Sequence, residues 1–267
     1  MLHGDYNTIM QKKYKSIFIS DLHLGSSGCK ADLICNFLKH NNSENLFLVG
    51  DIIDGWRLQR KFYFPQSHIN VIRRILTAAK RETEVIYVAG NHDEFLRIFL
   101  KFGISFGNIK IVNQHIYEAI NGKTYLVMHG DMFDTFIKNN LKFLYHLGDF
   151  LYRFLLKANA IVHQFRNLFN LPHWSLSAYL KHKTKETISY LNNFEILVTD
   201  YCNKRNANGI ICGHVHHAEI KKIGDIEYMN DGDWVESCTA LVENHDGTWE
   251  IVKWTMKNDD DNDSSDY

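Results

Sequence analysis

The chain has 267 residues, of which 45% are hydrophobic and 13% aromatic, enough for a packed core in one large domain or two small ones. The formal net charge is -1, which gives no overall indication of nucleic acid binding, and no stretch approaches the ~20 apolar residues of a membrane span. The five cysteines form no CxxC pair, and the N-terminus has no apolar signal region. We therefore expect reduced thiols and a cytoplasmic location.

Short apolar runs alternate with helical patterns along the chain. Runs rich in β-branched and aromatic residues, typical of buried strands, lie at 16–20, 45–50, 84–90, 123–130 and 209–214. Residues 67–81 have a helical period. After His217, short strands are predicted at 218–223, 226–230, 238–244 and 248–254, with hairpin turns at 224–225 and 246–247. The alternation predicts a layered α/β domain, and we expect the last strands to extend a second sheet in antiparallel fashion.

The segment between Asp131 and Ala207 interrupts this alternation. It is helical in period and rich in Phe, Leu and Tyr, and residues 136–205 contain ten Lys and Arg against four Asp and Glu. The rest of the chain contains 20 basic and 27 acidic residues. We expect a helical lid at about 133–205 inside a single domain of residues 1–257, followed by a disordered acidic tail at 258–267. The basic lid indicates a local anionic partner, with ordinary solvated helices as the alternative.

Every predicted core strand ends in polar side chains, which is where open α/β sheets place their sites. These side chains are Asp21 and His23, then Asp51 and Asp54, then Asn91, His92 and Asp93, then His129, and last His214 and His216. Ligands of the Asp, His and Asn types suit Mn²⁺, Fe, Zn²⁺ or Mg²⁺ rather than a thiolate site. Their number exceeds one ion's needs and fits two ions that share a carboxylate.

Residue spacing adds an expectation about geometry. In an extended segment alternate side chains point to the same side, so Asp21 and His23 would share one ion while Leu22 enters the core. The same reasoning applies to His214 and His216 around Val215. His217 breaks the alternation and is expected outside the ligand set.

The motifs "SDLHLG", "VGDIIDGW", "AGNHD", "HGD" and "GHVHH", in this order, resemble the signature blocks of the calcineurin-like metallophosphoesterases over roughly residues 16–220. The resemblance implies a four-layer αββα sandwich with an inserted helical cap and a dinuclear metal centre. It assigns one ion to Asp21, His23, Asp51 and His216, and the second to Asp51, Asn91, His129 and His214, with Asp51 bridging. It implies a hydrolase in which a metal-activated hydroxide attacks phosphorus, and Mn²⁺ is the expected ion, with Fe, Zn²⁺ and Mg²⁺ as alternatives.

The resemblance also casts His92 as the residue that protonates the leaving oxygen or stabilises the transition state. A histidine does this near pH 7 when a partner orients it, and Asp54 is the candidate partner. An N-cap is the alternative role for Asp54. Asp93 is expected to cap the helix that follows it.

Within the family, the chain further resembles the UDP-2,3-diacylglucosamine diphosphatases of lipid A synthesis. Asp51, Asp54 and Trp56 follow the pattern of that branch, as do "HGD" and the position of the lid. The resemblance implies release of UMP and a lipid monophosphate. The Lys and Arg of the lid lead to the further hypothesis that the cytoplasmic protein is peripheral on the inner face of the membrane. The branch usually has Arg where this chain has His92, which leaves the substrate open.

Other functions compete with this interpretation. Another nucleotide, cyclic nucleotide or lipid phosphoester is the alternative substrate class. A nuclease would need basic grooves outside the lid, and the net charge of -7 outside residues 136–205 disfavours nucleic acid. A non-enzymatic scaffold would lack metal ligands, whereas all seven are present here. The basic lid is expected to meet an anionic membrane in a salt-sensitive manner.

Overall fold

The computed structural model describes residues 12–102, 105–134 and 194–256. The chain forms two compact units, one of residues 1–130 and 199–267 and the other of residues 131–198. The lid expected at about 133–205 lies almost entirely outside the described residues, and the acidic tail at 258–267 lies wholly outside them. The fold below is that of the first unit.

A seven-stranded sheet forms one half of the first unit, in the order β12-β11-β1-β2-β3-β5-β4. Four of its strands, β1, β2, β3 and β5, are parallel, as expected for a chain that returns through helices. Phe18 of β1 lies opposite Phe47 of β2, and their rings stack with centroids 4.5 Å apart. The strands are β1 (Lys12–Ile19), β2 (Asn41–Val49), β3 (Glu84–Val88), β4 (Ser105–Phe106), β5 (Ile109–Val112), β11 (Thr239–Glu243) and β12 (Trp249–Lys253).

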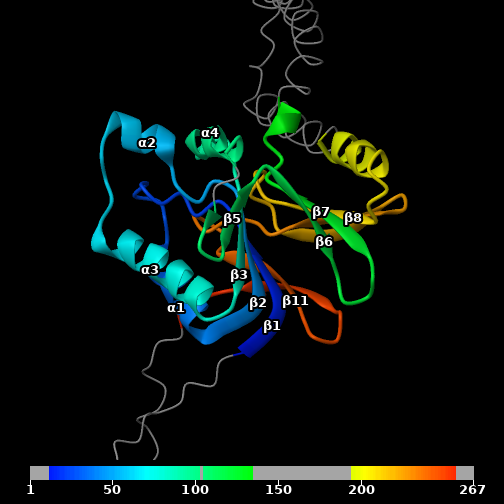
Figure 1. Ribbon diagram of the computed structural model, residues 1–267, viewed down its shortest axis with the longest axis horizontal. Coiled ribbons are helices and arrows are strands. Elements are labelled where there is room, and N and C mark those ends of the chain that lie inside the picture. Colours follow the sequence, from blue (N-terminus) through cyan, green and yellow to red (C-terminus); the bar gives the residue numbers. More distant parts are fainter. Residues whose placement is uncertain (1–11, 103–104, 135–193, 257–267) are drawn as a thin grey trace, which may run out of the picture. The chain divides into compact units, whose positions relative to one another are not determined.

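Two helices cover one face of this sheet, α1 (Ala31–His40) and α3 (Gln66–Lys80). Along α3 the buried residues Val71, Ile75 and Ala79 recur every four positions and form one apolar stripe. They join one core cluster with residues of β1, β2 and β3 (Figure 1). Shorter helical segments follow strand ends, namely α2 (Gly55–Arg60), the 3₁₀ turn η1 (Glu94–Leu96) and α4 (Arg97–Leu100).

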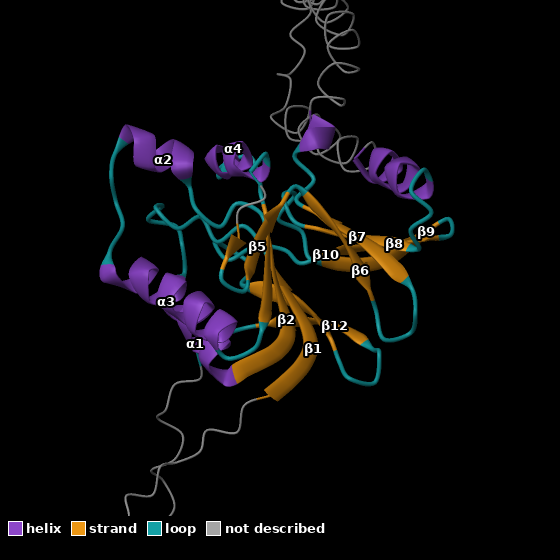
Figure 2. Cartoon of the chain, in the orientation of Figure 1, coloured by secondary structure: helices purple, strands orange, loops and turns teal. Residues whose placement is uncertain are grey.

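A five-stranded sheet, in the order β6-β7-β8-β10-β9, packs against the other face of the first sheet (Figure 2). The interface is a second core cluster in which Phe18, Phe47 and Ile86 of the first sheet meet Val127 and Ile211 of the second. Burying each such side chain stabilises the sandwich by about 1.5–3 kcal/mol. The strands are β6 (Gln114–Glu118), β7 (Thr124–Met128), β8 (Gly209–Cys212), β9 (Glu219–Ile223) and β10 (Ile226–Asn230). The two packed sheets with helices on the outer face give the expected αββα class of fold.

The five predicted core strands and the helix at 67–81 are all present, as are the turns at 224–225 and 246–247. The last hairpin was expected in the second sheet, and this prediction was wrong. β11 pairs antiparallel with β1 and extends the first sheet, whereas β9 and β10 lie in the second sheet. The all-buried β11 covers the otherwise open edge of the apolar β1, which a sequence pattern does not reveal. Among the described residues, no helix is long and apolar enough to cross a bilayer.

Candidate metal centre

The predicted ligands converge because both sheets bring the carboxyl ends of parallel strands to a common edge. The segments after β1 and β2 run side by side, with Asp21 N donating to Gly50 O (3.0 Å) and His23 N donating to Asp51 O (3.0 Å). The loop after β8 reaches the same place, where His214 N donates to Asp21 Oδ2 (2.9 Å). Side chains almost 200 positions apart in the sequence are thereby brought within hydrogen-bond distance.

Left-handed backbone conformations aim these side chains. Eight non-glycine residues among those described have a positive φ, and five of them are predicted ligands: Asp21, His23, Asp51, His214 and His216. Such conformations cost about 1–3 kcal/mol each and persist where surrounding contacts hold them. The prediction that Asp21 and His23 share a side because the segment is extended was therefore wrong: left-handed backbone conformations orient them. Leu22 is fully buried, as expected. Val215 is only partly buried, so the loop after β8 does not alternate either.

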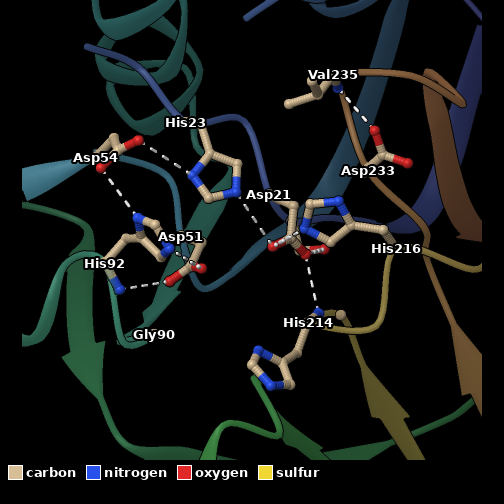
Figure 3. Close-up of polar contacts among 12 residues, drawn as sticks. Asp21, His23, Asp51, Asp54, Gly90, His92, His214, His216, Asp233 and Val235 are labelled. Atoms are coloured by element: carbon tan, nitrogen blue, oxygen red, sulfur yellow. Dashed lines mark hydrogen bonds and ion pairs between the residues drawn. The ribbon is translucent and has the colours of Figure 1, made fainter. Parts of the chain in front are cut away.

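The first ligand group consists of Asp21, His23 and His216, whose ligand atoms lie within 4.8 Å of one another. His216 Nε2 lies 3.0 Å from Asp21 Oδ1, and His23 Nε2 lies 3.6 Å from the same oxygen (Figure 3). Burial would raise the pKa of Asp21, but hydrogen bonds from His216 and His23 outweigh it and hold that pKa well below its ordinary value. The same contact with Asp21 raises the pKa of His216.

The second group consists of Asp21, Asp51 and His129, again within 4.8 Å. His129 Nε2 lies 3.3 Å from Asp51 Oδ2, while its Nδ1 lies 2.8 Å from the carbonyl oxygen of Val49. That carbonyl fixes the tautomer, since Nδ1 must donate and Nε2 is left to face the carboxylates. Burial opposes ionisation of Asp51, but His129 lowers its pKa below the ordinary value. The two groups share Asp21, and a third group of His23, Asp54 and His92 shares His23 with the first.

Asn91 and His214 border the second group. The His214 ring lies against the His129 ring with centroids 5.0 Å apart. Asn91 Oδ1 is buried and has no hydrogen-bond partner among the described residues. His217 is exposed and belongs to none of the ligand groups found there.

His92 is held by Asp54 beside these groups. Its Nδ1 lies 2.9 Å from Asp54 Oδ1, and its backbone N–H donates to Asp51 Oδ1 (2.8 Å). Asp54 also accepts from Arg57 N (3.0 Å), so it caps α2 and contacts His92 at the same time. The Trp56 ring packs on the His92 ring at 4.2 Å between centroids. His92 is thus oriented from two sides.

Asp93 joins the loops that carry the site residues and does not cap the following turn. Its side chain makes no cap hydrogen bond to η1. It accepts instead from Ile52 N (2.9 Å), Tyr87 OH (2.6 Å) and Gly90 N (2.5 Å), which ties the loop after β2 to the loop after β3. Burial raises the pKa of this carboxyl.

Two supporting residues, Ser20 and Asp231, were missed in the sequence. Ser20 Oγ lies 2.6 Å from Asp21 Oδ2 and 2.6 Å from Asp231 Oδ1, and all three side chains are buried. Ser20 Oγ thus bridges the two carboxyl groups, and burial raises the pKa of Asp231 well above its ordinary value. The available signal was "NDGDW" directly after the strand at 226–230, a strand end like the others.

The donor set fits divalent cations. Two carboxylates and several imidazoles form overlapping ligand groups, and the neighbour of His92 in the sequence, Asn91, has a buried amide oxygen with no partner among the described residues, which is costly. Oxygen and imidazole donors of this mixture suit Mn²⁺, Fe, Zn²⁺ and Mg²⁺.

Comparison with known proteins agrees with this geometry. Residues 14–218 match the Calcineurin-like phosphoesterase family. The UDP-2,3-diacylglucosamine hydrolase of Blochmanniella pennsylvanica (strain BPEN) is 24% identical over 213 residues, which are 78% of this chain and 81% of that protein.

Solved structures with a similar arrangement have low sequence identity. Vps29 from Entamoeba histolytica in complex with Zn²⁺ is 12% identical, covers 89% of this chain and 97% of its own, and has a TM-score of 0.38. An archaeal phosphodiesterase is 12% identical, covers 89% and 98%, and has a TM-score of 0.39. Because these TM-scores are below 0.5, we base the assignment on the sequence match. The chain belongs to the calcineurin-like phosphoesterase family and is a metal-dependent hydrolase of phosphoesters.

Proposed function

We propose that this enzyme uses two divalent metal ions to hydrolyse a phosphoanhydride or phosphodiester bond. Asp21, His23, Asp51 and His216 would hold the first ion, and Asp51, Asn91, His129 and His214 the second, with Asp51 shared. The observation that carries the proposal is that two ligand groups share the buried carboxylate of Asp21 and that one of them also contains the buried carboxylate of Asp51. Mn²⁺ is the ion we propose, with Fe, Zn²⁺ and Mg²⁺ as alternatives.

The residues around the ions have separable tasks. When bound, two such ions supply a water nucleophile that is acidified toward neutral pH and a positive field for the phosphoryl oxygens. The backbone N–H of His92 fixes the orientation of Asp51, and Asp54 fixes the ring of His92. With Nδ1 held by Asp54, Nε2 of His92 is available to donate a proton to the departing oxygen.

The substrate that we propose is UDP-2,3-diacylglucosamine, cleaved to UMP and a lipid monophosphate. Support comes from the similarity to the hydrolase of Blochmanniella pennsylvanica and from the resemblance of Asp51, Asp54 and Trp56 to the pattern of the diphosphatase branch. The apolar, basic segment 136–205 suits a substrate with acyl chains and a pyrophosphate.

The test is an assay of the purified full chain with Mn²⁺ against UDP-2,3-diacylglucosamine, with bis-p-nitrophenyl phosphate as a generic diester. His23→Ala removes a proposed ligand, and His217→Ala is the matched control because it removes an exposed imidazole of the same region. Release of UMP that survives His217→Ala and is lost in His23→Ala would support the proposal. Cleavage of the generic diester alone would reject this substrate and keep the two-ion site.

A second candidate is hydrolysis of another nucleotide, cyclic nucleotide or lipid phosphoester. The observation that favours it is the His92–Asp54 pair, which stands where the diphosphatase branch usually has Arg. An enzyme of the broader family type would lose activity in His92→Arg, whereas an enzyme of the diphosphatase type would keep or gain it.

We further propose a cytoplasmic enzyme that is peripheral on the inner face of the membrane. All five cysteines are free thiols, and Cys202, Cys212 and Cys238 are buried. Burial raises the pKa of Cys212 to about 12 and that of Cys202 to about 11, so neither is reactive near neutral pH. The basic segment 136–205 is one element that would meet an anionic membrane, which salt-sensitive vesicle binding would test.

A further inference from the structure

An exposed surface that is both apolar and basic begins at the candidate metal centre. It comprises residues 55–63, which contain α2, and residues 94–102, which contain η1 and α4; we call it the α2–α4 surface. The two segments meet where Gly55 N donates to His92 O (3.0 Å) and where a side chain at Gly55 would touch the Phe95 ring. α2 and α4 lie at the same end of the first unit in Figure 1.

The α2–α4 surface exposes large apolar side chains that nothing described covers. Phe62 is 79% exposed, Phe102 75% and Ile98 60%, and Trp56, Tyr63 and Phe95 are each exposed by more than a third. Single exposed apolar residues are ordinary, but six on two segments that meet at Gly55 indicate an interaction site.

The same surface is strongly basic. Residues 55–63 and 94–102 contain three arginines and two lysines against one acidic residue, Glu94. Arg60, Lys61 and Lys101 are exposed, and none makes an ion pair with any residue that the structure describes. Three exposed cations without an ion pair among the described residues, together with six exposed apolar side chains on two neighbouring segments, suit a partner that is anionic at its surface and apolar beneath.

The charge of each possible partner decides which of them can bind the α2–α4 surface. Residues 135–193 of this chain carry eight Lys and Arg against two Asp and Glu, so they would be repelled. A second copy of the surface would be repelled for the same reason. Nucleic acid is anionic, but its bases stack on aromatic rings and gain nothing comparable from an aliphatic side chain such as Ile98. A lipid bilayer accepts both aliphatic and aromatic side chains below its headgroups.

We propose that the α2–α4 surface docks on an anionic lipid bilayer. Phe62 and Phe102 enter the boundary between headgroups and acyl chains, while Arg60, Lys61 and Lys101 contact the lipid phosphates. Because Trp56 begins the surface and packs on His92, docking holds the candidate metal centre at the membrane. The inference does not depend on which phosphoester is hydrolysed.

Vesicle co-sedimentation of the full chain tests the proposal. Phosphatidylcholine vesicles with and without phosphatidylglycerol are compared at low and high salt. We expect binding that requires phosphatidylglycerol and weakens with salt. Arg60→Glu combined with Lys61→Glu and Lys101→Glu lowers the partition coefficient at least about 100-fold, since each cation near such a surface contributes about 1 kcal/mol. Phe62→Ser with Phe102→Ser lowers it about tenfold.

Matched controls carry the same changes elsewhere. Arg73→Glu with Lys80→Glu and Arg81→Glu reverses three exposed charges on and just after α3, and Leu76→Ser with Ile220→Ser removes exposed apolar side chains from α3 and β9. All variants are checked for wild-type circular dichroism and for hydrolysis of bis-p-nitrophenyl phosphate without vesicles. Binding is measured independently of activity, so an inactive chain would count against the proposed function alone.

Several outcomes overturn the proposal. Equal loss in the surface variants and the controls would show that the overall charge, rather than this surface, mediates binding. Wild-type binding by the surface variants would leave the basic segment 136–205 as the membrane contact. If the wild-type chain forms a dimer that the surface variants dissociate, the partner is a second copy of the chain. If the wild-type chain does not bind vesicles but binds single-stranded RNA, and the surface variants abolish that binding, the partner is nucleic acid.

Discussion

His92 has its ring position fixed by Asp54 and Trp56, yet its backbone N–H is what contacts Asp51. His92→Ala therefore removes the proton donor and keeps the contact to the proposed ligand. We expect kcat to fall about 10²–10⁴-fold for a substrate whose leaving oxygen needs a proton. Bis-p-nitrophenyl phosphate, with a leaving group that departs unprotonated, should lose much less. Steady-state kinetics on both substrates, with bound metal measured in parallel, check this expectation; equal losses would contradict it.

Gly90 shows how closely the strands approach at the site. A Cβ there would overlap Asp51 Oδ1 and lie 2.9 Å from Cδ2 of His129. Gly90→Ala should displace Asp51, lower metal affinity about 10–100-fold and destabilise the fold by about 1–3 kcal/mol. Gly224→Ala is the control, since Gly224 has φ +60° but nothing within 4 Å, so it adds backbone strain without a clash. Metal titration and urea unfolding distinguish the two; similar metal affinity in both variants would refute the steric explanation.

At the scale of elements, the strands and their polar ends could be predicted because apolar runs and following ligands are local patterns. The conformations that aim Asp21 and His214 could not, because left-handed turns at non-glycine residues depend on contacts from distant strands. Asp231 was missed for a related reason. Asp231 contacts the site through Ser20, and a contact between the ends of β10 and β1 produces no motif with a recognisable spacing in the sequence. The pairing of β11 with β1 is equally nonlocal.

A buried polar cluster joins elements of both sheets away from the ligands. Tyr117 of β6 donates to Glu243 of β11, lies 2.7 Å from Ser16 Oγ of β1, and is buried together with both. Tyr117→Phe would leave Glu243 with Ile120 N, at 2.9 Å, as its remaining hydrogen-bond donor among the described residues. We expect the free energy of unfolding to fall by about 1–3 kcal/mol while kcat and KM stay unchanged.

Urea unfolding and steady-state kinetics measure these two effects of Tyr117→Phe. Tyr63→Phe is the control, because the Tyr63 side chain is 44% exposed and should cost almost nothing. A fall in kcat without a fall in stability would mean that the cluster acts on the site instead of joining the sheets.

At the scale of the molecule, each sheet supplies part of the candidate metal centre. Asp21, Asp51 and Asn91 follow strands of the first sheet, whereas His129 and His214 follow strands of the second. The aromatic core between the sheets sets the distance between these two contributions, so the sandwich and the site are expected to stabilise each other. Buried carboxylates that face each other without a cation repel, and bound cations would remove that cost.

Metal removal should therefore lower the stability of the whole fold. An ion that binds only the folded chain stabilises it by about 2.7 kcal/mol at one hundred times its Kd. For a domain of this size that corresponds to a rise in Tm of about 5–10 °C for each ion, and so of about 10–20 °C for two ions. We expect EDTA to lower Tm by this amount and Mn²⁺ to restore it, with about two equivalents bound per chain by elemental analysis. His23→Ala should reduce the shift and His217→Ala should leave it intact. A Tm that changes with neither EDTA nor Mn²⁺ would contradict the two-ion site, whichever substrate the enzyme hydrolyses.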